Sequence, residues 1–196
     1  MREMTVVDYD PSWPAAYEAE IGRLRAVLGD VVVRAHHIGS TAVPGLAAKP
    51  VIDVLLEVRD LGSLDAREEA MRGIGYEPRG EFGIPGRRYY PKGGDRRTHH
   101  VHAFAVGDPH IEEHLAFRDH LRERPDAAAA YARVKREAAA KHRYDPEGYV
   151  RHKEDFVART LSDALGRGRT SAARPATLAR KSRILPPTSR EPSVPA

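Results

Sequence analysis

The pattern of apolar residues predicts an amphipathic helix near the start of the chain. Ser12 is a typical helix N-cap, and after it apolar residues recur at i, i+4, i+7 and i+11. The residues of this stripe are Tyr17, Ile21, Leu24 and Leu28. Gly29 follows them and is typical of a helix end. The pattern therefore predicts a helix with one apolar face that ends at Gly29.

Two apolar runs follow, at residues 31–38 and 51–58, and each is short enough to be a strand. The second run is apolar at nearly every position, which is typical of a strand buried on both faces. Asp53 interrupts this run. An ionised carboxylate in such a strand requires a cationic partner or a metal ion.

The middle of the chain predicts a helix over residues 61–74, a strand over 76–82 and then a β-hairpin whose return strand is 98–106. Side chains alternate between the two faces of a strand. His100 and His102 are therefore predicted to share one face of the return strand.

From Pro109 onward the pattern is helical, with further helices expected to begin at Pro125 and at Pro146. Arg118 and Asp119 are predicted to form a structural ion pair that anchors the first of these helices on the sheet. The fold class predicted from this order of elements is α/β (α+β): a mixed sheet flanked by helices, with a C-terminal helical layer.

The last part of the chain has a different composition. Residues 166–196 are rich in Arg, Ser, Thr, Ala and Pro and contain too little apolar material to fold. We therefore predict one folded domain over residues 1–165 and a disordered basic tail over residues 166–196.

Composition narrows the class of protein. The 196 residues suit a single domain, and the absence of cysteine excludes disulfides, thiolate metal sites and cysteine catalysis. No apolar run approaches the ~18 residues of a membrane span, and the N-terminus lacks the long apolar segment of a signal peptide. A cytoplasmic protein that makes no membrane contact is the expectation.

The basic charge is concentrated in the predicted tail. The chain has a net charge of +4 and a pI of about 9.4. Residues 166–196 hold seven Lys or Arg and one acid, a charge of +6, so residues 1–165 carry −2. The folded part therefore lacks a basic footprint, and we expect it not to bind duplex nucleic acid.

Candidate chemistry is concentrated between residues 36 and 58. The glycine of the Gly39-Ser40-Thr41 turn permits close approach of the backbone, so its N–H groups and hydroxyls can face a phosphate. Asp53, in the strand that follows, can hold a divalent metal ion. An ordinary turn, and an ion pair of Asp53 with Lys49 or an arginine, are the structural alternatives.

Longer segments of the sequence resemble the GrpB family over roughly residues 5–162. The matching segments are YDPSWP (9–14), HIGSTAVPGL (37–46), KPVID (49–53), RRYY (87–90), HHVH (99–102) and LAFRDHL (115–121), together with Tyr131, Lys135, Tyr149 and Lys153. The resemblance implies a nucleotidyltransferase-like fold that binds a nucleotide or another phosphorylated small molecule with a divalent metal ion, Mg²⁺ or Mn²⁺. Nucleotidyl transfer would be the reaction. Relatives are also found fused to dephospho-coenzyme A kinase domains.

Within this resemblance the candidate site residues fall into two groups. Three are predicted to be catalytic and to ligate the metal ion: Asp53, His100 and His102. Six are predicted to bind the substrate: Gly39, Ser40, Thr41, Lys49, Arg87 and Arg88. His37, directly before the turn, is a further candidate for the histidine group, and a solvated hairpin face is the alternative for the histidines and arginines.

One position departs from the nucleotidyltransferase pattern. Such enzymes usually carry a second carboxylate two residues after the first, where this chain has Leu55. Glu57 lies on the same strand face but ~13 Å from Asp53, too far to share one metal ion. The alternative function is therefore a non-catalytic binding or accessory module, for example one linked to coenzyme A biosynthesis.

Overall fold

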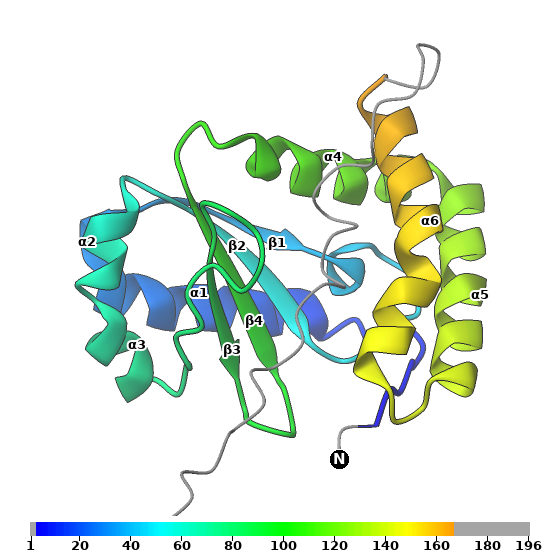
Figure 1. Ribbon diagram of the computed structural model, residues 1–196, viewed down its shortest axis with the longest axis horizontal. Coiled ribbons are helices and arrows are strands. Elements are labelled where there is room, and N and C mark those ends of the chain that lie inside the picture. The colour runs from blue at the N-terminus through cyan, green and yellow to red at the C-terminus, as the bar shows by residue number, and fades with distance from the viewer. Residues whose placement is uncertain (1–2, 167–196) are drawn as a thin grey trace, which may run out of the picture.

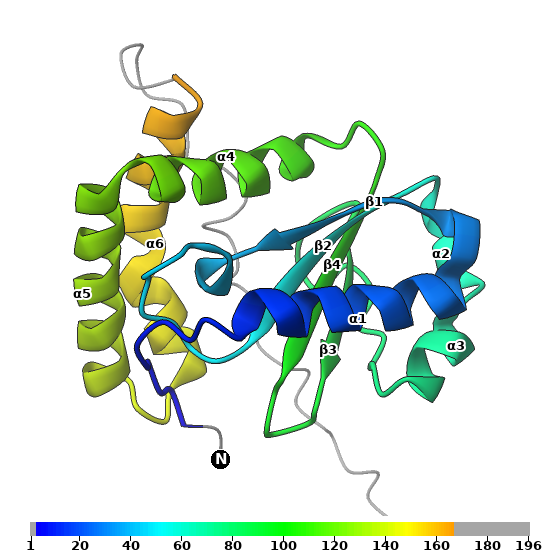
Figure 2. The ribbon, with the colours of Figure 1, turned by 180° about the vertical axis from the view of Figure 1, so that it is seen from behind.

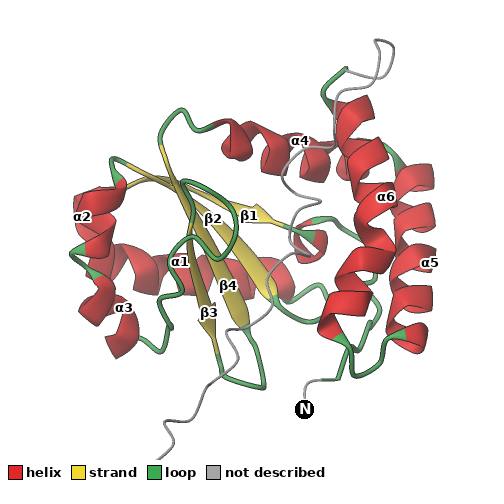
Figure 3. Cartoon of the chain, viewed as in Figure 1, coloured by secondary structure: helices red, strands yellow, loops and turns green. Residues whose placement is uncertain are grey.

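The computed structural model describes residues 3–166, and Figure 1 shows how their elements are arranged. A sheet lies at the centre, with helices on both of its faces and a helical layer at one end (Figure 3). Apart from Gly166, the predicted tail lies outside the described residues. Its disorder, and the boundary between domain and tail, stay predictions.

The sheet has four strands: β1 (Val32–Ile38), β2 (Ile52–Val58), β3 (Arg88–Lys92) and β4 (His99–Ala105). Their spatial order is β1-β2-β4-β3; β2 and β4 are parallel, and the other neighbours are antiparallel. Because β3 is an edge strand, it tolerates Pro91, which has no N–H to donate. The mixed sheet flanked by helices confirms the predicted fold class.

One face of the sheet packs against α1 (Trp13–Leu28), which Figure 2 shows in front of the strands. The predicted apolar stripe of α1 is buried, in one core cluster with Val54 and Leu56 of β2 and Val101 of β4. Ser12 occupies the predicted N-cap position, but it does not cap the helix through its side chain. Its side chain makes no capping hydrogen bond, and its N–H donates to Asp10 Oδ1 at 2.8 Å.

The segment between β2 and β3 differs from its prediction. Residues 61–74 form two short helices, α2 (Leu61–Asp65) and α3 (Glu68–Gly73), because the chain leaves helical geometry at Arg67. The predicted strand over 76–82 is also wrong, since only Tyr76 makes a bridge, with Lys92. The glycines at 80 and 83 take positive φ angles of 55° and 80°, so the chain turns there.

The C-terminal helices are α4 (Pro109–Glu123), α5 (Pro125–Lys141) and α6 (Pro146–Ala164). The predicted ion pair of Arg118 with Asp119 is confirmed at 2.7 Å, and Arg118 also donates to the His37 carbonyl at 3.1 Å. Arg122 donates twice to the Ala42 carbonyl, at 2.8 and 2.9 Å. Helix α4 is thus tied to the end of β1 and to the turn that follows it. Within residues 3–166, no helix combines the length and apolar character required to cross a bilayer.

Candidate metal and ligand site

Three predicted metal ligands meet where β2 and β4 run side by side. Asp53 lies directly opposite His100 in the parallel register, and His102 follows on the same strand face. His100 Nδ1 is 3.0 Å from Asp53 Oδ1, and His102 Nε2 is 3.7 Å from the same oxygen. One potential ligand atom from each residue lies within 4.8 Å of the other two. The fold therefore brings together a carboxylate and two imidazoles from segments nearly fifty residues apart.

Gly39 makes room for this cluster. It connects β1 to the short 3-10 helix η2 (Ser40–Ala42) and has a φ of +71°. A Cβ atom at this position would lie 2.5 Å from Asp53 Oδ2, closer than van der Waals contact allows. Both the backbone conformation and the close approach of the carboxylate therefore require glycine.

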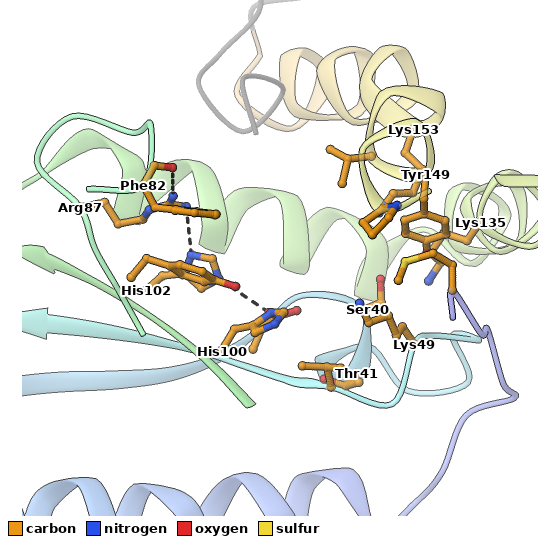
Figure 4. Close-up of a pocket in the computed structure, with 16 residues that line it drawn as sticks. Ser40, Thr41, Lys49, Phe82, Arg87, His100, His102, Lys135, Tyr149 and Lys153 are labelled. Atoms are coloured by element: carbon orange, nitrogen blue, oxygen red, sulfur yellow. Dashed lines mark hydrogen bonds and ion pairs between the residues drawn. The ribbon is translucent and has the colours of Figure 1, made fainter. Parts of the chain in front are cut away.

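The cluster opens into a cavity of about 280 Å³ between the sheet and the helical layer. Figure 4 shows Phe82, Arg87, His100 and His102 on one side, with Lys135, Tyr149 and Lys153 on the other. The lining residues predicted from sequence are Ser40, Thr41, Lys49, Asp53, Arg87, His100 and His102. The predicted residues of three separate segments thus border one hollow.

Arg87 is almost fully buried beside the cluster, with 2% of its surface exposed. Its guanidinium donates to the carbonyls of Glu81 and Phe82 at 3.1 and 2.6 Å, and Nη1 lies 3.5 Å from His102 Nδ1. That last distance is at the long limit for a hydrogen bond, so the contact between Arg87 and His102 is weak. Burial lowers the pKa of Arg87 to about 10, which leaves it charged at neutral pH.

The helical wall carries lysines close to tyrosine rings. Lys135 of α5 is 2% exposed, donates to the Ala47 carbonyl and lies 4.6 Å from the centroid of the Tyr131 ring. Burial lowers its pKa to about 6. Lys153 of α6 lies 4.2 Å from the centroid of the Tyr149 ring. Together with Lys49, these side chains give the cavity a wall of amines.

Lys135, Tyr149 and Lys153 line the cavity, although no site role was predicted for them from the sequence. A signal was present, since both Tyr131/Lys135 and Tyr149/Lys153 are spaced at i, i+4, which places each pair on one helix face. The spacing does not tell which face looks into a cavity, because that depends on how α5 and α6 pack on the sheet.

Thr41 and His37 are engaged with each other next to the site. Thr41 borders the cavity, but its hydroxyl lies 3.0 Å from His37 Nε2. His37 stacks on Tyr17 with 4.8 Å between ring centroids, and burial lowers its pKa to about 4. His37 pairs with Val54 in the sheet and therefore faces α1, away from Asp53. The expectation that His37 could join the metal ligands is corrected by this placement.

Arg88 also lies away from the cavity. Its guanidinium donates to both carboxylate oxygens of Asp65 in α2, at 2.6 and 2.7 Å. Successive residues of a strand point to opposite faces, so Arg88 faces α2 while Tyr89 faces the histidines. The prediction that Arg88 binds the substrate is corrected to a structural ion pair.

The strand face that carries Asp53 offers no second carboxylate to the same ion among the residues described. Leu55 is fully buried in an apolar cluster with Phe104 and Ile38. Glu57 is held by Arg34 and His36, each at 2.7 Å. The hydrogen bond from Arg34 keeps the pKa of Glu57 below its usual value.

A smaller cavity of about 150 Å³ shares Ser40, Asp53, His102 and Lys153 with the first. Glu154 of α6 also lines it. This hollow therefore brings one further carboxylate to the surroundings of Asp53, and it comes from the helical layer instead of β2.

Known proteins resemble this chain over most of its described length. A family model for the GrpB protein matches residues 3–163. The UPF0157 protein YqkA of Bacillus subtilis is 44% identical over 156 residues, 80% of this chain and 46% of that protein. A dephospho-CoA kinase of Mycolicibacterium paratuberculosis is 32% identical over 177 residues, 77% of this chain and 43% of the kinase. The chain thus spans about half the length of these two relatives.

Two solved structures show the same fold. The conserved protein GrpB from Enterococcus faecalis superposes with a TM-score of 0.80 at 40% identity, over 83% of this chain and 98% of that chain. Terminal uridylyl transferase 4 from Trypanosoma brucei with bound dUTP superposes with a TM-score of 0.52 at 13% identity, over 96% of this chain and 63% of that chain. The second likeness concerns the fold alone and confirms its nucleotidyltransferase-like class.

Proposed function

The chain belongs to the GrpB family, and from that premise we propose that it binds a nucleotide or another phosphorylated small molecule together with a divalent metal ion. The observation that carries the proposal is the convergence of Asp53, His100 and His102 at one end of the cavity. Their chemistry fits a metal ion, because a carboxylate and two neutral imidazoles are typical ligands of divalent transition metals.

The types of ligand atom in the cluster also favour one of the two expected ions, Mn²⁺ and Mg²⁺, over the other. Mg²⁺ prefers oxygen ligands throughout, whereas first-row transition ions also bind imidazole, and Mn²⁺ is the one of the two expected ions that belongs to this class. We therefore expect Asp53, His100 and His102 to hold Mn²⁺ more tightly than Mg²⁺. When bound, the ion would neutralise phosphate charge and polarise a phosphoryl oxygen.

The phosphates of the ligand would meet the polar residues around the cluster. Gly39 permits close approach of the backbone, and Ser40 offers its hydroxyl. Lys49, Lys135 and Lys153 border the same hollow and supply donors for anionic oxygens.

A thermal-shift series tests the proposal, with nucleotides and coenzyme A precursors added in the presence and absence of Mn²⁺ or Mg²⁺. A ligand at one hundred times its Kd stabilises the folded state by about 2.7 kcal/mol, so binding is readily visible. We expect stabilisation that requires both the metal ion and the phosphorylated compound.

The variant Asp53→Asn identifies the site. It should abolish the metal-dependent shift in melting temperature. Without ligand, it should change the free energy of unfolding by less than about 1 kcal/mol, because Asp53 contacts histidines that can be neutral. A matched control is Asp30→Asn, which alters an exposed carboxylate paired with Arg59. A loss of ~3 kcal/mol or more in ligand-free Asp53→Asn would instead indicate a fixed ion pair and contradict the metal site.

The second candidate function is a binding or accessory module without turnover. Leu55, buried in an apolar cluster where a second carboxylate would stand, favours it. Nucleotidyl transfer breaks the bond between the α- and β-phosphates and releases pyrophosphate as an acceptor oxygen bonds to the α-phosphorus. Metal-dependent nucleotide binding with no pyrophosphate release, across a panel of acceptors, would select the module over the transferase.

A further inference from the structure

Phe82 is an exposed aromatic side chain at the cavity. It lies in the turn before β3, lines the cavity, and leaves 48% of its surface exposed. Its φ angle is 44°, and it is the one non-glycine residue with positive φ in the part of the chain that the structure describes. A bulky side chain in this conformation is strained, and residues of this kind concentrate at ligand sites.

One face of the Phe82 ring packs against the protein. It stacks on Tyr89, with 5.1 Å between ring centroids and 19° between ring planes. Its carbonyl accepts a 2.6 Å hydrogen bond from the buried Arg87, whose guanidinium carbon lies 5.0 Å from the Tyr89 centroid. One face of the Phe82 ring is therefore covered, its position is fixed, and the remaining surface is available to a ligand.

The fold itself does not require an aromatic ring at this position. Glycine would adopt the same φ without strain, as Gly80 and Gly83 do on either side. An exposed aromatic side chain also gains little from burial. The strain and the exposure together indicate a role in binding.

The two walls of the cavity differ in chemistry. Phe82 and Tyr89 form an aromatic wall next to the histidines of the cluster. Lys135 and Lys153 line the opposite side and form an amine wall (Figure 4). A ligand that satisfies both walls has a planar ring at one end and phosphates at the other.

We propose that Phe82 is the stacking platform for the planar ring of the ligand, and hence that this ligand is a nucleotide and not an aliphatic phosphate. The inference rests on the proposed function and names the substrate class of the same site. Stacking on an aromatic side chain accepts any base, because every base has a π-face. It therefore fixes the orientation of the ligand more than the identity of its base.

Calorimetric titration with a nucleoside triphosphate and with inorganic triphosphate, both with Mn²⁺, tests this inference on the full chain. Phe82→Ala should weaken nucleotide binding about 10-fold, the size expected for one lost stacking contact, and leave inorganic triphosphate binding unchanged. Phe82→Tyr should retain nucleotide affinity. Val106→Ala is the control, because Val106 is also 48% exposed and does not line the cavity.

Phe82→Gly separates a binding role from a structural one. It relieves the backbone strain that Phe82→Ala keeps, so it should melt at a higher temperature than Phe82→Ala while losing nucleotide affinity to the same extent. The stacking role of Phe82 would be overturned, with the proposed function intact, if both variants kept the nucleotide affinity of the wild type. It would also be overturned if they lost affinity for inorganic triphosphate as much as for the nucleotide. A wild type that binds neither compound would overturn the proposed function, and the platform with it.

Discussion

At the residue scale, the site depends on one glycine placed against one carboxylate. Gly39 has a left-handed φ, and its missing side chain leaves the space that Asp53 Oδ2 occupies. Asp53 in turn contacts both histidines of the cluster. The position of the turn and the position of the metal ligand are therefore not independent.

Gly39→Ala should destabilise the protein and displace Asp53. Gly45→Ala is the matched control, since Gly45 also has a positive φ, of 76°, but a Cβ atom at that position would meet nothing within 4 Å. Both variants should lose about 1–3 kcal/mol from the backbone conformation, because both glycines have positive φ. Only Gly39→Ala should lose more than that and also lose Mn²⁺ binding. Urea unfolding and metal titration measure the two effects, and equal behaviour of the variants would contradict the steric argument.

Lys135 makes a prediction about pH. Burial lowers its pKa from 10.5 to about 6, so between these values the unfolded chain holds a proton that the folded chain has released. The contribution of Lys135 to stability therefore rises with pH across this window, by up to about 1.4 kcal/mol per pH unit, and is constant below pH 6.

Urea unfolding of Lys135→Met between pH 6.5 and 9 measures that contribution. The variant should be more stable than the wild type at pH 6.5, and the difference should shrink as the pH rises. Lys141→Met, which changes an exposed lysine near the end of the same helix, is the control and should follow the wild type. A constant difference between Lys135→Met and the wild type would show that Lys135 is charged when buried.

At the element scale, sequence patterns predicted the strands that carry the site better than the segments between them. The apolar run interrupted by Asp53 and the alternation of His100 and His102 follow directly from strand geometry, and the structure has both. The predicted strand over 76–82 failed because glycines turn the chain there, and the same turn sets Phe82 at the cavity.

Arg88 shows a second reason why the sequence pattern alone does not identify the residues of the site. Two consecutive arginines begin the hairpin, but they point to opposite faces, so only Arg87 reaches the cavity. Strand alternation alone predicts that the two diverge, yet the face that each takes depends on the register of β3 against β4. Neighbouring residues of one type therefore cannot be assigned one role before the register is known.

At the scale of the whole molecule, the cavity exists only because a helical layer lies against one end of the sheet. Arg118 and Arg122 of α4 hold the carbonyls of His37 and Ala42, and Lys135 of α5 holds that of Ala47. These contacts join residues 80 or more positions apart in the chain. The local periodicity of a sequence carries no information on such contacts. The positions of Lys135 and Lys153 at the cavity therefore could not be predicted from the sequence.

A ligand bound between the two walls should therefore stabilise both of them at once. We expect hydrogen exchange with Mn²⁺ and nucleotide to slow in β2 and β4 as well as in α5 and α6, because opening either wall would expose the ligand. In Lys153→Met, with ligand at saturating concentration, the protection of β2 and β4 should persist while that of α6 falls. Val106→Ala, which lies outside the cavity, serves as the control and should retain the full pattern. Protection confined to the sheet in the wild type would contradict a ligand site that spans both walls.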